Sequence, residues 1–266
     1  MKGHSVLEHL ASALWVKGDR KRCFMAVFNS YYDTSGTEHD SRVLATAGFM
    51  ATAYRWGIFD SRWNAVLLKY EVSKHHMVDF AQGKGEFKSW KDNKERRAAY
   101  LKDLVQPMCL VHSHVVTLDV THFKRINERY LLREKYGGAY GLANTLCADR
   151  LTERIRKHHP EEIGYFPEDG DAGQAAYKAA ARRMGRLVVP IPKKNPSTGK
   201  TLPVFQALDF IAYEWRLTHD RVMREERRAM RESFLELWVE LDIRAKMISA
   251  SDLKRLCADQ EIPIRN

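Results

Sequence analysis

The chain has 266 residues, of which 44% are apolar and 11% aromatic, so it can bury a core and does not have a disordered composition. It carries 44 Lys and Arg against 34 Asp and Glu, a net charge of +10, and a pI of about 9.4. This balance favours a polyanionic partner, and nucleic acid before a membrane, because no long apolar span accompanies the charge.

The cysteines and the first residues indicate the compartment. The four cysteines are isolated from one another: Cys23, Cys109, Cys147 and Cys257. No pair has the close spacing of a zinc site, which favours a reducing compartment. The first fifteen residues place Glu8 and two histidines among apolar positions, which predicts an amphipathic helix and not a signal peptide. A cytoplasmic location is the simplest inference.

Stretches with strand and helix patterns alternate along the chain. Apolar, β-rich stretches bounded by turn formers predict strands at 23–33, 42–51, 112–120, 162–166 and 186–191. Apolar residues three and four apart predict helices at 54–72, 91–111, 140–157, 175–184 and 203–247, and then a short helix at the C-terminal end. The short loop at 34–41 predicts an antiparallel hairpin, and the basic turn at 193–200 is expected to stay exposed. The order predicts an α/β fold in which helices cover a mixed sheet.

Several acids occupy comparable places in this pattern. Asp33 ends an apolar run just before Thr34-Ser35-Gly36, so it either caps that turn or is held rigidly at the mouth of a sheet. Asp79 follows the first long helix, 168–171 ends a later strand, and Asp209 lies among apolar residues of a helix. A buried acid requires a partner, and carboxylates around a hard cation are what Mg²⁺-dependent phosphoryl transfer requires. A metal centre of this kind requires their oxygens to converge within a few ångströms.

A resemblance adds to these patterns. The pieces that carry it are YYDTSG, RVLATAGF, a helix with Trp56 and Trp63, HHMVDF with GEFKSW, YFPEDGD and PVFQALDFIAYEW. In this order they resemble the domain of unknown function 3800 family, whose fold is similar to ribonuclease H, over roughly residues 23–220. The resemblance implies a five-stranded mixed sheet with acids gathered at its centre, and a nuclease that depends on Mg²⁺ or Mn²⁺.

The resemblance also implies site residues. The family motifs D-E-S-G, H-M-x-D-F, E-x-G-D and L-Q-x-A-D match, in order, Asp33; His76 and Asp79; Glu168 and Asp171; Gln206 and Asp209. We therefore expect Asp33, Asp79, Glu168 and Asp209 to be catalytic metal ligands, with Asp171 as an alternative ligand. Gln206 is expected to orient a carboxylate or contact a phosphate.

Other positions remain open. His76 is either a proton shuttle or a core imidazole. The loop after Asp79 offers lysines for a phosphate backbone: Lys84, Lys88 and Lys91. Two positions depart from the family pattern, because Thr34 stands where an acid is common and Leu208 where a small alanine is usual. Loss of an acid at position 34 removes one candidate ligand.

The leading hypothesis is a Mg²⁺-dependent nuclease. Its ribonuclease H-like domain, 23–220, lies between an N-terminal helical extension, 1–22, and a long C-terminal helical extension, 221–266. The alternative is a non-catalytic nucleic-acid-binding or assembly component of a bacterial antiphage system or mobile element, which uses the C-terminal helices for a partner or for self-association. A hydrolase of small phosphates stays open. No P-loop, Rossmann glycine pattern or nucleophile elbow is present, which disfavours kinases, dehydrogenases and serine hydrolases.

Overall fold

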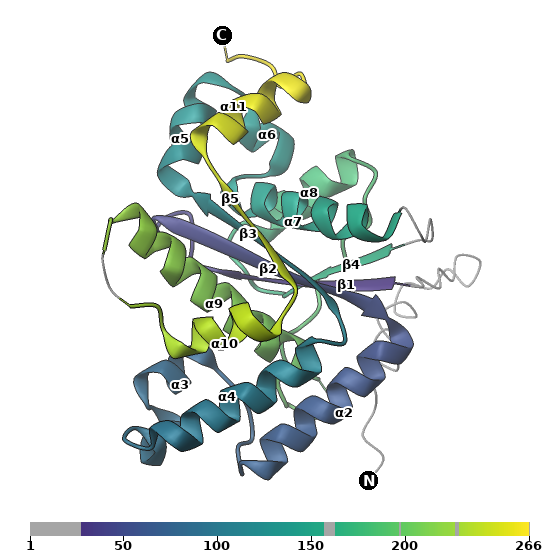
Figure 1. The fold of residues 1–266 in the computed structure, drawn as a ribbon. Helices are drawn as coiled ribbons and strands as arrows, with labels where there is room; N and C mark the ends of the chain where they lie inside the picture. Colours follow the sequence, from purple (N-terminus) through teal and green to yellow (C-terminus); the bar gives the residue numbers. More distant parts are fainter. Residues whose placement is uncertain (1–27, 157–162, 197, 227–228, 266) are drawn as a thin grey trace, which may run out of the picture.

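The computed structural model describes residues 28–156, 163–196, 198–226 and 229–265, and in them one five-stranded mixed sheet lies between two layers of helices (Figure 1). The strands are β1 (Phe28–Ser35), β2 (Val43–Thr52), β3 (His112–Asp119), β4 (Ile163–Pro167) and β5 (Ile243–Ile248). Their order is β4-β1-β2-β3-β5. β2 is antiparallel to β1 and β3, whereas β4 is parallel to β1 and β5 is parallel to β3. The predicted mixed sheet covered by helices is confirmed.

The helices divide between the two faces of the sheet. They are α2 (Ala53–Lys69), α3 (Met77–Gln82), α4 (Lys94–Met108), α5 (Val120–Arg129), α6 (Leu132–Tyr136), α7 (Ala139–Arg156), α8 (Gln174–Arg183), α9 (Pro203–Met223), α10 (Glu232–Glu240) and α11 (Ala250–Asp259), with a 3-10 turn η1 (Gly85–Trp90). Figure 1 shows α7 on one face and α9 on the other, with α2, α3, α4 and α10 on the side of α9. No described helix is long and apolar enough to cross a membrane.

Strand alternation builds a separate core on each face. In β2, Ala47 and Phe49 are buried in the core that contains α9, whereas Leu44 and Met50 are buried in the core that contains α7. Because successive side chains of a strand point to opposite faces, a strand buried on both sides is apolar almost throughout, as VLATAGFMA is. Successive side chains of β1 therefore face α9 and α7 in turn.

Most predicted elements are confirmed, including the β1–β2 hairpin, but the predicted strand at 186–191 is wrong as a regular strand. Val188 and Ile191 form only single parallel bridges, to Tyr165 and Glu168 beside β4. The segment donates to β4 from the Val189 and Ile191 N–H groups, and Pro190 and Pro192 take the alternate positions that face away from β4, as prolines of an edge segment do. The predicted N-terminal helix and residues 23–27 lie outside the described residues.

The predicted helix at 203–247 is also wrong beyond Met223. The chain turns at Glu225, whose φ of 54° is left-handed, then forms α10 and enters β5. No glycine or proline lies between Pro203 and Pro263, so the usual markers of a helix end are missing from the sequence. The C-terminal part is therefore not wholly helical, because β5 completes the edge of the sheet beside β3.

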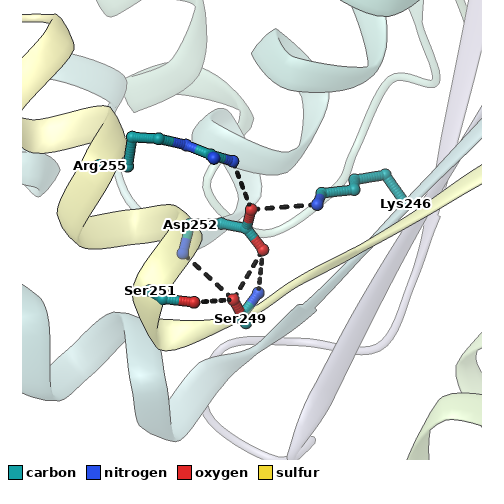
Figure 2. Close-up of polar contacts among 5 residues, drawn as sticks. All are labelled: Lys246, Ser249, Ser251, Asp252 and Arg255. Carbon is teal, nitrogen blue, oxygen red and sulfur yellow. Dashed lines mark hydrogen bonds and ion pairs between the residues drawn. The ribbon is translucent and has the colours of Figure 1, made fainter.

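A capping box joins β5 directly to α11 (Figure 2). The Ser249 hydroxyl accepts a hydrogen bond from the Asp252 backbone N–H at 3.1 Å, and the Asp252 carboxylate accepts one from the Ser249 N–H at 3.0 Å. Lys246 and Arg255 lie 3.0 and 2.9 Å from the same carboxylate. Burial raises the pKa of Asp252, but the Ser249 hydrogen bonds and Lys246 outweigh it and lower that pKa to about 2. These contacts fix the point where the edge strand becomes a helix.

Two helical glycines test the packing of this fold. A Cβ added at Gly141 of α7 would lie 1.9 Å from the Tyr136 carbonyl oxygen, whereas a Cβ at Gly57 of α2 would meet nothing within 4 Å. We expect Gly141→Ala to lower the free energy of unfolding by about 3 kcal/mol because the backbone must shift. Gly57→Ala should raise it by roughly 0.5–1 kcal/mol through helix propensity. Urea unfolding measures both changes, and equal effects of the two substitutions would contradict the packing described.

Candidate metal centre

The parallel pairing of β1 with β4 brings two carboxylates together. The register pairs Tyr31 with Phe166 and Tyr32 with Pro167, and the Glu168 N–H donates to the Tyr32 carbonyl at 2.9 Å. Asp33 and Glu168 are the next residues on the two strands. Because parity is kept, both acids face the same side as Tyr31 and Phe166, which pack under α9 with ring centroids 5.4 Å apart. The two carboxylates thus stand side by side where the parallel strands end.

Asp171 completes a group of three. One carboxylate oxygen from each of Asp33, Glu168 and Asp171 lies within 4.8 Å of the others. Asp33 and Glu168 are only 6% and 9% exposed. Asp171 lies in the turn after β4, where Gly170 has a φ of 102° that suits glycine. The sequence prediction of acids converging from distant segments holds for these three residues.

The donor set fits a small hard cation. All three donors are carboxylates; oxygens around one Mg²⁺ are about 2.9 Å apart when adjacent and about 4.2 Å when opposite, so three oxygens within 4.8 Å of one another surround the ion once the side chains move closer together. The Asp171 Oδ2 atom is buried and has no hydrogen-bond partner within 3.5 Å among the described residues, although the Tyr140 hydroxyl is near enough to lower the pKa of this acid. None of those residues donates a hydrogen bond to the buried Asp33 carboxylate either. Buried carboxylate oxygens without donors are suited to binding a cation.

Like charges and burial shift the acidity of this group. Burial raises the pKa of Asp33 well above its ordinary value, and the charges of Glu168, Asp209 and Asp171 add to this, while Lys193 lowers it. Burial, followed by the charge of Glu168, raises the pKa of Asp171 to about 6. Both shifts favour the protonated acid when no cation is bound.

Lys193 is a site residue that the sequence did not reveal. It lies in the basic turn expected to stay exposed, yet its Nζ is 3.0 Å from Glu168 Oε2 and its side chain is 34% exposed. Burial lowers the pKa of Lys193, but the charges of Asp33, Glu168 and Asp209 outweigh it and the pKa rises. The ammonium therefore stays charged beside the acids. The one sequence feature that points to Lys193 is its place two residues after the predicted strand at 186–191.

Asp209 lies at the border of the centre and has a structural partner. Its Oδ2 accepts a hydrogen bond from the Met77 N–H at 2.8 Å, so this carboxylate of α9 caps the N-terminus of α3. Its charge still acts on Asp33 and Lys193. Asp209 is thus near the three clustered acids without being one of them.

Asp79 and His76 form a pair of their own. His76 Nδ1 lies 3.0 Å from Asp79 Oδ2, and their side chains are 41% and 34% exposed. The predicted centre of Asp33, Asp79, Glu168 and Asp209 is therefore corrected, since among the described residues the converging acid is Asp171 and not Asp79. The His76–Asp79 contact can fix one tautomer of the imidazole, so the role of His76 in proton transfer stays a prediction.

Gln206 is buried, and its side chain makes hydrogen bonds within the protein. It is 2% exposed; its Oε1 accepts from the His75 N–H at 2.6 Å and from the Trp63 indole at 3.3 Å, and its Nε2 donates to the Thr201 carbonyl. The predicted contact between Gln206 and a phosphate is therefore not supported by its position. His75, to which the sequence assigned nothing, is buried among aromatic rings, and burial, followed by the charge of His76, lowers its pKa to about 3.

Thr34 does not weaken the centre in the way the resemblance suggested. Its hydroxyl lies 2.9 Å from the Thr46 hydroxyl and 3.1 Å from Nδ2 of Asn144 on α7. A side chain at position 34 therefore points to the face opposite Asp33, and an acid there would also face α7. The lysines predicted to contact a phosphate backbone are exposed on and beside η1: Lys84, Lys88 and Lys91.

Comparison with models of known protein families finds no match to this chain, and comparison with curated proteins finds no relative. The similarity to the domain of unknown function 3800 family thus stays a prediction from the sequence pieces.

The raised pKa values of Asp33 and Asp171 make cation binding depend on pH. The pKa of Asp171 is about 6 in the folded protein against about 4 when unfolded, so its contribution to stability is present below pH 4 and lost as the pH rises through 6. A cation binds the deprotonated acid, so Mn²⁺ should raise the Tm by about 5 °C at pH 7.5 and much less at pH 5. Differential scanning calorimetry with and without Mn²⁺ measures this. Equal shifts at both pH values, or an undiminished shift in Asp171→Asn at pH 7.5, would contradict the assignment.

Proposed function

We propose that the chain is a divalent-cation-dependent nuclease with a ribonuclease H-like fold, which hydrolyses phosphodiester bonds of nucleic acid. The observation that carries the proposal is the group of Asp33, Glu168 and Asp171, whose oxygens lie within 4.8 Å at the ends of two parallel strands. Buried carboxylates with raised pKa values and a lysine beside them are more typical of a reaction centre than of a surface cluster.

The fold supports this proposal at a coarser level. The resemblance implied a five-stranded mixed sheet with acids gathered near its middle, and the sheet has five strands of mixed direction. β1, which carries Asp33, is an inner strand that lies between β4 and β2. Because parallel strands end at the same edge, ligands commonly bind outside those ends.

The residues of the centre have separate tasks. When bound, a divalent cation supplies the Lewis acidity that polarises a phosphate and makes water more nucleophilic. Asp33, Glu168 and Asp171 would hold it through one oxygen each, and their burial limits competition from bulk water. Lys193 offers an ammonium for a non-bridging phosphate oxygen. His76, oriented by Asp79, is the candidate for delivering a proton to the departing oxygen.

The charge of the chain agrees with a nucleic-acid substrate. The net charge of +10 favours association with a polyphosphate, and the attraction should weaken steeply with added salt. Exposed lysines near η1 belong to the segment that follows Asp79, with the Lys84 N–H bonded to the Asp79 carbonyl at 2.8 Å. These lysines remain the candidates for contact with a nucleic-acid backbone.

One observation favours the second candidate, a non-catalytic assembly component. Helix α10 exposes three large apolar side chains: Leu235, Trp238 and Val239, which are 44%, 59% and 75% exposed. An apolar helix face of this kind is typical of a surface that binds protein. Binding of nucleic acid without cleavage, together with association through α10, would favour this candidate over the nuclease.

Substitution of the clustered acids tests the nuclease. Asp33→Asn and Glu168→Gln should each lower Mg²⁺- or Mn²⁺-dependent cleavage of RNA or DNA oligonucleotides by about a hundredfold or more, because each removes a charged ligand. The matched control is Asp169→Asn, since Asp169 adjoins Glu168 but is exposed and outside the cluster. The control should cleave like the unmodified chain. Unchanged cleavage by purified, folded Asp33→Asn protein would eliminate the proposal.

A further inference from the structure

Backbone hydrogen bonds fix the chain just before Lys193 and at Lys193 itself. Just before it, the Ile191 N–H donates to the Pro167 carbonyl at 3.0 Å, and the Asp169 N–H donates to the Ile191 carbonyl at 2.8 Å. At Lys193 itself, the backbone carbonyl accepts from the Leu202 N–H at 2.9 Å. These bonds tie the segment to the end of β4 and to the start of α9. The 3.0 Å contact between Lys193 and Glu168 is therefore built by the backbone and is not an incidental surface pair.

Two of the acids whose charges act on Lys193 already have partners. Glu168 Oε2 faces the ammonium, and Asp209 Oδ2 accepts a hydrogen bond from the Met77 N–H. A centre with two cations about 3.5–4 Å apart needs carboxylates on both sides of a bridging ligand. Here Glu168 belongs to one group with Asp33 and Asp171, and its Oε2 also pairs with the Lys193 ammonium.

Asp33 gives an independent indication of a bound cation. Asp33 is buried, since only 6% of the residue is exposed. Among the described residues its carboxylate takes part in no hydrogen bond and no ion pair within 4.0 Å, although its oxygen lies within 4.8 Å of ligand atoms of the other two acids. A buried carboxylate without a donor is costly unless a cation compensates it.

We propose that this centre takes one divalent cation, held by Asp33, Glu168 and Asp171, and that the Lys193 ammonium stands in the place of a second. One dication and one ammonium balance the three clustered carboxylates, and the nearby Asp209 carboxylate adds one further negative charge. A second dication in addition to Lys193 would leave the same buried group with an excess of positive charge. Resting on the proposed function, Lys193 then holds an oxygen of the scissile phosphate, as a second metal ion does elsewhere.

Mn²⁺ binding to the full chain tests the number of cations. Isothermal titration calorimetry at pH 7.5 should give one Mn²⁺ per chain. In Lys193→Met the stoichiometry should stay at one while the Kd falls by about tenfold, because a competing positive charge beside Glu168 is removed. Lys194→Met is the matched control, since Lys194 is adjacent and exposed, and its Kd should not change. Two Mn²⁺ per unmodified chain, or an unchanged Kd in Lys193→Met, would overturn the proposal.

Cleavage separates a role in the reaction from one in the fold. Lys193→Met should cleave an oligonucleotide about a hundredfold more slowly although it binds Mn²⁺ more tightly, and Lys193→Arg should recover most of the rate. Damage to the fold would weaken both properties together, and that result would overturn the proposal. If the unmodified chain binds one Mn²⁺, tightened by Lys193→Met, but cleaves nothing, the proposed nuclease fails while the single-cation centre stands. If the chain cleaves but binds two Mn²⁺, the single-cation centre fails while the proposed nuclease stands.

Discussion

The parallel register of β1 with β4 is the constraint on which the rest of the centre depends. It pairs Tyr31 with Phe166 in the core, and two residues later each strand delivers an acid to the same face. The backbone hydrogen bond from Glu168 to the Tyr32 carbonyl prevents the strands from separating to relieve the repulsion. The aromatic core thus stabilises the sheet while holding Asp33 and Glu168 in an unfavourable proximity, which is how preorganised sites store electrostatic strain.

The sequence predicts those parts of the fold whose signals are local. The hairpin of β1 with β2, the strand β3 and helix α2 each carry their own periodicity and turn residues, so their positions follow from a few neighbouring residues. β5 could not be found in this way. The chain leaves α9 through a left-handed Glu225 without glycine or proline, and β5 gains its partners from β3, more than a hundred residues earlier. A charged segment that forms an edge strand only by pairing with a distant strand has little signal of its own.

The difference between local sequence signals and contacts between distant segments also explains which site residues could be predicted. Asp33 and Glu168 could be predicted because each directly follows an apolar run, and Asp171 because the turn is close to Glu168. Asp209 and Asp79 also follow the pattern, but nearby groups compete for them: the free N–H at the start of α3 for one and His76 for the other. No local sequence pattern shows that Asp209 accepts a backbone hydrogen bond or that Asp79 pairs with His76. The arrangement in space decides, and it brings together the carboxylates of Asp33, Glu168 and Asp171.

The irregular segment beside β4 accounts for the position of Lys193. In a regular strand the side chains after Ile191 would keep alternating across the sheet and the backbone would continue its ladder. The segment bonds to β4 through the Val189 and Ile191 N–H groups, with Pro190 and Pro192 at the alternate positions; after Ile191 the chain is tied through the Lys193–Leu202 bond to the start of α9. The ammonium reaches Glu168 from this irregular segment. The contact between Lys193 and Glu168 therefore depends on backbone bonds to β4 and to α9, two elements that lie far apart in the sequence, and a local sequence pattern does not show it.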